Sequence, residues 1–90
     1  MFRDFIHWIH GQLDAHYFHD ARGPDLRILL SIEQQRELIT QGHLVDSPHF
    51  HFENYCQRDP KTGLISTILG VEVVSTVETK PPLVVRLAAL

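Results

Sequence analysis

The chain has little cysteine, few basic residues and no long apolar run, and each shortage excludes a class of protein. Its single cysteine, Cys56, cannot form an internal disulfide, which favours a reducing compartment, so we expect a cytoplasmic protein. Eight basic residues against eleven acidic ones give a net charge of −3, which argues against nucleic-acid binding. No apolar run approaches the roughly 20 residues that span a bilayer, and the first residues lack the basic-then-apolar order of a signal peptide. We therefore expect no membrane association.

Motifs typical of common enzyme classes are also missing. The sequence has no Gly-rich phosphate loop, no pair of cysteines at zinc-binding spacing and no Gly-x-Ser-x-Gly motif. With 43% hydrophobic and 21% charged residues, the chain of 90 residues has the composition of one small globular domain. We predict a single domain over residues 1–90, with a helical half at about 2–42 and a β half at about 48–90.

Histidine is the residue type in excess, with seven in the 90 residues. Adding seven positive charges to the net charge of −3 would give +4. Histidine side chains ordinarily gain their charge between pH 5 and 8, so charged associations of this protein should depend on pH. The alternative is that the imidazoles are simply solvated and that their number has no function.

Apolar spacing predicts a first helix from residue 2 to about residue 20. At about 100° per residue, one sector collects the side chains that such a helix buries, namely Phe2, Phe5, Ile6, Ile9, Leu13 and His16. Gly23 and Pro24 should end this segment. Trp8 lies beside the buried sector, where it would either contact a partner or cover the edge of its own core. A polar cluster on the opposite side, which we interpret as a solvated face, consists of Arg3, His7, His10 and Asp14.

A second helix follows an undecided stretch. Residues 25–30 fit either a short strand or the lead-in to the helix. Ser31 is a suitable N-cap, and Gln34 three residues later completes a capping box. Gly42 should supply the residue that ends the helix. The apolar face is narrow, chiefly Ile32 and Ile39, so we expect this helix to lie on the surface.

The second half of the chain changes to the two-residue period of strands. Residues 49–56 alternate between two kinds of side chain, and residues 64–77 are rich in β-branched residues. The sequence at 59–63 is typical of a type I turn, with Gly63 free to take a positive φ at its exit. These features predict a β-hairpin. Residues 83–87 can add a third strand.

The length of the turn predicts the register of this hairpin. It sets Phe52 opposite Val71 and Cys56 opposite Thr67. The apolar faces of both strands then coincide, and the thiol of Cys56 is buried there and unreactive. The opposite face would carry polar groups together with Leu64, Ile68, Val74 and Tyr55.

The same register brings histidines and carboxylates together on that opposite face. His49, His51 and Glu53 occupy every second position, and Glu72 would lie across from His51. Imidazole and carboxylate are ligands of zinc and iron, and a site with three protein ligands and an open position supports hydrolytic or oxidative chemistry. The alternative is a solvated strand face on which His51 and Glu72 form an ordinary cross-strand pair.

One face of such a sheet should need a cover. Two helices cannot cover both faces, and the apolar segment at 83–90 would be prone to aggregation if it were an exposed edge. A second copy of the chain is the simplest cover. The candidate partner-binding residues are Trp8, Tyr55, Val85 and Leu87.

These observations predict an α+β fold in which two helices pack on a small antiparallel sheet, made of a C-terminal β-hairpin and one further strand. We expect a small non-catalytic protein-binding or regulatory protein, of the size of small bacterial or phage regulators and inhibitors. We expect it to act as a homodimer and also to bind another protein. We expect no cofactor. The alternative is a metal-dependent enzyme, or a metal or pH sensor, that holds a divalent ion such as zinc or iron at His49, His51, Glu53 and Glu72.

Overall fold

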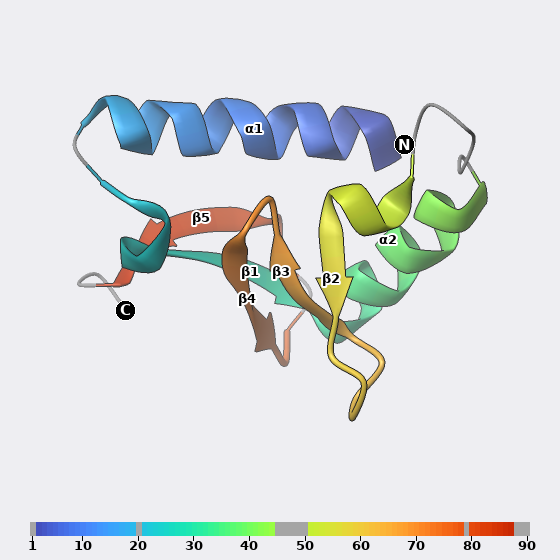
Figure 1. Cartoon of the computed structure of the whole chain (residues 1–90). Coiled ribbons are helices and arrows are strands. Elements are labelled where there is room, and N and C mark those ends of the chain that lie inside the picture. The colour runs from blue at the N-terminus through green and yellow to red at the C-terminus, as the bar shows by residue number, and fades with distance from the viewer. Residues whose placement is uncertain (1, 20, 45–50, 79, 88–90) are drawn as a thin grey trace.

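The computed structural model describes residues 2–19, 21–44, 51–78 and 80–87, and within these ranges two helices and a five-stranded sheet form the predicted α+β fold (Figure 1). The helices are α1 (Phe2–Phe18) and α2 (Ile32–Leu44). The strands in chain order are β1 (Leu26–Ser31), β2 (Cys56–Arg58), β3 (Ile65–Ile68), β4 (Val71–Thr76) and β5 (Leu83–Arg86). Short 3₁₀ helices precede β1 and β2, at Gly23–Asp25 and Phe52–Asn54.

The sheet is mixed, whereas the sequence led us to expect antiparallel strands only. The strand order is β2-β3-β4-β1-β5. β1 runs parallel to β4, with Ile28 beside Val73, and the other neighbouring strands are antiparallel. The parallel pair was not expected, because the sequence left open whether residues 25–30 form a strand. In the structure they contribute most of β1, which lies between β4 and β5. The connection from β1 to β4 contains α2 and the β2–β3 hairpin, which is long enough for the crossover that parallel strands require.

Helix α1 lies along one face of the sheet, above β5 and β1 in Figure 1. It confirms the first predicted helix, and its buried residues belong to the predicted apolar sector: Phe2, Ile6, Ile9 and Leu13. They share one hydrophobic core with three residues of β1, Leu26, Ile28 and Leu30. His16, predicted inside the same sector, is only half-buried.

Helix α2 begins where the capping box was predicted. The backbone N–H of Gln34 donates to Ser31 Oγ at 3.1 Å, and the backbone N–H of Ser31 donates to Gln34 Oε1 at 2.8 Å. Two N–H groups that the first turn of a helix leaves unpaired are thereby satisfied. A local signal of four residues thus identifies the start of α2 correctly.

The predicted apolar face of α2 is confirmed at one of its two residues, since Ile39 is half-buried against the core, and the predicted end of the helix was wrong. Ile32 is 40% exposed, and the buried residues of the helix are Gln35, Leu38 and Gly42. Gly42 does not end the helix, which continues to Leu44. A Cβ at Gly42 would lie 2.2 Å from Cδ2 of Phe52, so the glycine is needed for the close approach of the Phe52 ring.

The hairpin turn is confirmed, but the strand predicted before it is much shorter. The backbone N–H of Asp59 donates to the carbonyl of Leu64 at 2.8 Å, and Gly63 has a φ of +72°. The first part of the predicted strand at 49–56 lies partly outside the described residues, because His49 and Phe50 are not described. Strand β2 begins only at Cys56, after the 3₁₀ helix that contains Phe52.

The predicted register holds next to the turn and fails farther from it. Arg58 pairs with Ile65 as predicted, but a β-bulge then makes Ser66 an extra residue, and Cys56 pairs with Ile68 instead of Thr67. Ile68, which we expected on the polar face, is completely buried. The bulge shifts the alternation by one residue, and a one-residue shift moves every later side chain to the other face.

The predicted strand at 64–77 is two strands. Leu69 and Gly70 both have positive φ values, 51° and 80°, and form a two-residue turn between β3 and β4. Val71 therefore pairs with Ile68, and the predicted pairing of Phe52 with Val71 was wrong. The Phe52 ring instead packs against the ring of Phe2, with 5.5 Å between their centroids.

The third predicted strand is confirmed as β5. It pairs with β1 of the same chain in antiparallel orientation, with Val84 beside Ile28. Val84 is buried in the shared core. This pairing within the chain places β5 at one edge of the sheet and β2 at the other.

Candidate interaction face and cleft

The sheet buries one face against the helices and leaves the other partly exposed. The even-numbered residues 26, 28 and 30 of β1 are at most 1% exposed, whereas Arg27 and Leu29 are half-buried. Paired residues point to the same side of a sheet, so the register sets Leu29 beside Val74 and Leu83, and Arg27 beside Val85. We call these five residues the open face. They form an apolar surface with one charged residue at its side.

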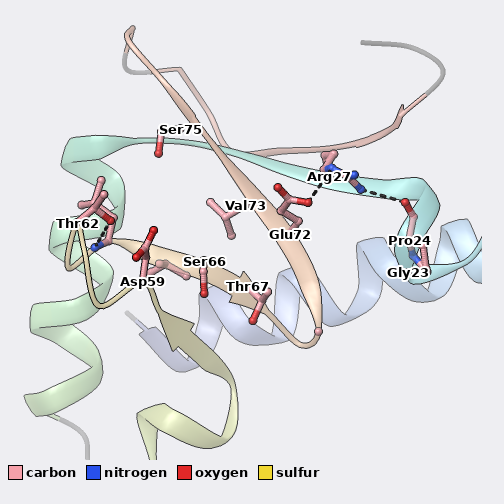
Figure 2. A pocket seen from close by; sticks show the side chains of 13 residues that line it. Gly23, Pro24, Arg27, Asp59, Thr62, Ser66, Thr67, Glu72, Val73 and Ser75 are labelled. Carbon is pink, nitrogen blue, oxygen red and sulfur yellow. Dashed lines mark hydrogen bonds and ion pairs between the residues drawn. The ribbon is translucent and has the colours of Figure 1, made fainter.

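The charge of Arg27 is balanced within the chain. Its Nε lies 3.4 Å from Oε2 of Glu72 on β4. Its Nη1 donates to the carbonyl oxygen of Pro24 at 3.0 Å (Figure 2) and to that of Leu26 at 2.7 Å. The side chain of Arg27 is 19% exposed, so these contacts hold it in one place. The one positive charge of the open face is therefore held in place and has a carboxylate beside it.

A cleft lies between β3 and β4, where the two strands separate beyond their turn (Figure 2). Their ladder begins at Ile68 and Val71 and ends at Thr67 and Glu72, and within the described residues it goes no further. The cleft has a volume of about 690 Å³. Asp59 lines one end and Arg27 and Glu72 the other, and Ser66 and Thr67 lie between them (Figure 2). Two further hydroxyl side chains, Thr62 and Ser75, also line the cleft.

Gln35 of α2 connects the strands on either side of the cleft. Its Oε1 accepts a hydrogen bond from the backbone N–H of Ile65 on β3 at 3.2 Å. Its Nε2 donates to Ser75 Oγ on β4 at 2.9 Å and to the carbonyl of Leu30 on β1 at 3.2 Å. The Gln35 side chain is completely buried, and among the described residues no buried side-chain polar atom lacks a hydrogen-bond partner. Gln35 thus fixes the width of the cleft.

The residues of the predicted metal site do not meet as the hairpin register implied. Glu72 pairs with Thr67 across the ladder, not with His51, which precedes the 3₁₀ helix that contains Glu53. His49 lies outside the described residues. Within the described part of the chain, no three or more His, Cys, Asp or Glu side chains are grouped closely enough to hold a metal ion. A metal site that includes His49 stays a prediction.

The predicted partner-binding residues occupy three separate places. Val85 belongs to the open face, and Leu87, directly after β5, is 48% exposed. Trp8 is 40% exposed on α1, with its ring 6.1 Å from that of Phe5. Tyr55 is half-buried beside β2. Only Val85 therefore lies on the open face.

Tyr55 lines a second groove, which runs along α1 and has a volume of about 730 Å³. The polar cluster that we interpreted as a solvated face forms its other wall: Arg3, His7, His10 and Asp14. His10 Nδ1 lies 3.3 Å from Asp14 Oδ2, and the two side chains are 63% and 67% exposed. The cluster is solvated as expected, although it also borders a groove.

The Cys56 thiol has the predicted environment. It is 2% exposed, and burial raises its pKa to about 12. A thiol with so high a pKa carries almost no thiolate at neutral pH, and thiolate is the nucleophilic form. Cys56 is therefore a core residue.

Sequence reasoning missed Gln35, although a signal for it existed. Gln35, Leu38 and Gly42 are separated by three and then four residues, which places them on one side of a helix. A glutamine and a glycine carry no apolar signal, so this side looked polar. The bulge at Ser66, which opens the cleft, has no comparable signal in the sequence.

Comparison with models of protein families, with curated proteins and with solved structures finds no match. Among the described helices, none has the length and apolar character that a membrane span requires.

Proposed function

We propose that this protein is a non-catalytic protein-binding or regulatory protein that forms a homodimer through the open face of its sheet. The observation that carries the proposal is the apolar character of that face. Leu29, Val74 and Val85 are half-buried and Leu83 is 52% exposed. All four lie on neighbouring strands. A contiguous apolar surface with polar residues around it is typical of a protein interaction site.

A second copy of the chain is the partner that the charges favour. In a twofold interface each surface meets a copy of itself, so a patch with charge of one sign would repel its partner. Here Arg27 and Glu72 form a balanced pair beside the apolar residues. The open face is therefore self-complementary in charge. The buried thiol of Cys56, with its raised pKa, also favours a role other than nucleophilic catalysis.

The proposal is tested by the native mass of the full chain and of two lysine variants. We expect a dimer at micromolar concentration for the native chain. Val85→Lys places a charge in the apolar contact and should raise the dimer dissociation constant by at least about 100-fold. Val77→Lys is the matched control, since Val77 is fully exposed outside the strands and its variant should remain dimeric.

Two results would contradict the dimer. One is a native chain that is monomeric at micromolar concentration. The other is a Val85→Lys variant that keeps the native dissociation constant. In either case the open face is not the interface between copies.

The alternative function, a metal-dependent enzyme or a metal or pH sensor, has its own readout. Elemental analysis of chelator-free protein should then find zinc or iron close to one ion per chain. The substitution His51→Ala should remove that metal, because His51 is one of the proposed ligands. A metal content near zero would leave homodimeric binding as the remaining proposal.

A further inference from the structure

The two edges of β4 are used to different extents. On one side β4 pairs with β1 at four consecutive positions, from Val73 to Thr76. On the other side it pairs with β3 at only two positions, Val71 and Glu72. Beyond Glu72 this side borders the cleft, and no strand of the described chain pairs with it there (Figure 2). β4 is therefore an interior strand with a partly free edge.

We propose that the cleft binds an extended peptide segment of another protein, which pairs as a strand with the free edge of β4. This inference rests on the proposed function as a protein-binding protein, and it names a second site and the form of the partner. Addition of a peptide strand to an exposed sheet edge is a common mode of recognition, in which backbone hydrogen bonds provide the affinity.

The ladder predicts which backbone groups point into the cleft. The two-residue turn at 69–70 makes Ile68 and Val71 a hydrogen-bonded pair. Every second residue of β4 from Val71 onward then directs its N–H and C=O toward β3. Val73 and Ser75 do so beyond the end of the ladder. Val73 is half-buried and Ser75 is exposed, and both line the cleft, so a peptide can reach them.

Strand β3 does not occupy this edge, because two features hold it away. The bulge at Ser66 interrupts the alternation of β3 just where the ladder ends. Two residues before the end of the ladder at Thr67, the N–H of Ile65 donates to Gln35 Oε1. The buried Gln35 side chain therefore accepts the hydrogen bond of the Ile65 N–H on β3. The backbone of Val73 and Ser75 remains without a strand partner in the described chain.

The lining of the cleft indicates which peptides fit. Asp59 and Glu72 supply two carboxylates against the one guanidinium of Arg27, which is already paired with Glu72. The charged residues that line the cleft therefore carry a net negative charge. Apolar and hydroxyl side chains lie between the ends, such as Val73 and Ser66. We expect a partner segment of β-branched residues with a lysine or arginine toward Asp59.

The test uses random peptides of about seven residues, close to the length of a strand, displayed on phage and selected on the immobilised full chain. Enriched peptides are synthesised with a fluorophore, and their dissociation constants are measured by anisotropy. Val73→Pro removes a backbone N–H that points into the cleft, and should weaken the best peptide at least about tenfold. Circular dichroism and the thermal midpoint establish that this variant folds.

The matched control is Arg86→Pro. If Val73 and Ser75 face β3, then Val74 faces β1. It pairs there with the backbone groups of Ile28 and Leu30, which leaves Arg27 facing β5. Val85 is then a hydrogen-bonded partner of Arg27, and the N–H of Arg86 points away from β1 at the outer edge of the sheet. This variant also loses one outward N–H, but it should bind the peptide as the native chain does. Equal weakening by both proline variants would place the peptide elsewhere and overturn the proposal, as would a selection that enriches no peptide.

A second measurement does not depend on whether Val73→Pro folds. A strand that pairs with β4 uses the N–H groups of alternate residues on its β4 side. Methylating one of these nitrogens in the peptide should weaken binding at least about tenfold, and methylating the next nitrogen should change it less than about threefold. Equal effects at every position would overturn pairing along one edge. Val85→Lys, the variant of the open face, should leave peptide binding unchanged, so the dimer and the cleft succeed or fail separately.

Discussion

The two faces of β1 both carry apolar residues, but their surroundings differ. Leu26, Ile28 and Leu30 point toward the helices and are at most 1% exposed, whereas Leu29 on the other face is half-buried. The residue types agree with this difference, because the even-numbered positions are all aliphatic and the other side carries Arg27 beside Leu29. Residues of α1 and α2 share a hydrophobic core with the aliphatic side only. The covered side stabilises the fold, and the other side is the face through which we propose that two copies of the chain meet.

The largest expected contrast is between two neighbouring alanine variants of β1. Ile28→Ala removes apolar atoms from a completely buried position and should lower the free energy of unfolding by about 2–5 kcal/mol. Leu29→Ala removes a half-buried side chain from the open face and should lower it by about 1 kcal/mol or less. Urea denaturation followed by circular dichroism measures both. One protein concentration is needed throughout, because dimerisation would add to the apparent stability.

That contrast disappears if the open face contributes to folding as much as the covered face does. Equal losses from both variants, measured at a concentration at which the chain is monomeric, would show that the difference between the faces is not energetic. Leu29→Ala should instead have its main effect on the dimer dissociation constant.

An intermediate effect is expected at Gln35, where the covered side meets the cleft. Gln35→Leu keeps a side chain of similar size but leaves the N–H of Ile65 without its acceptor. A buried donor without a partner costs about 1–3 kcal/mol. Hydrogen exchange at the Ile65 amide should accelerate. The amide of Leu69, which donates to the carbonyl of Tyr55 at 2.7 Å, is the internal control and should keep its rate. Unchanged exchange at Ile65 would mean that Gln35 does not hold β3 at the cleft.

The features predicted correctly from the sequence are those whose signal is local. The capping box at Ser31, the turn that contains Gly63 and the apolar sector of α1 each depend on residues within a few positions of one another. The open face was anticipated because the sequence offered only two helices for a whole sheet. Of the residues that form the open face, the sequence analysis assigned only Val74 and Val85 to an exposed or partner-binding position.

The features that were missed depend on contacts between distant residues. Gly42 is buried because the ring of Phe52 lies against it, and nothing near residue 42 indicates this contact. The cleft exists because a bulge in β3 and a glutamine of α2 act together. A strand pattern specifies alternation but not where the alternation is interrupted. The predicted contact between His51 and Glu72 failed for the same reason.

The smallest expected effect is at Cys56. The contribution of its buried thiol to the free energy of unfolding decreases only in alkaline solution. Burial raises the thiol pKa from 9.0 to about 12, so the folded chain keeps its proton where the unfolded chain loses it. Ionisation therefore favours the unfolded state, and the stability that the buried thiol contributes is fully present below pH 9 and is lost as the pH rises from 9 toward 12. Cys56→Ala lacks this titration and serves as the reference. The difference in unfolding free energy between the two chains should be constant below pH 9. Above pH 9 the native chain should lose stability relative to the variant. A difference that stays constant up to pH 11 would mean that the thiol is not shielded, and that the covered side of the sheet opens to solvent near β2.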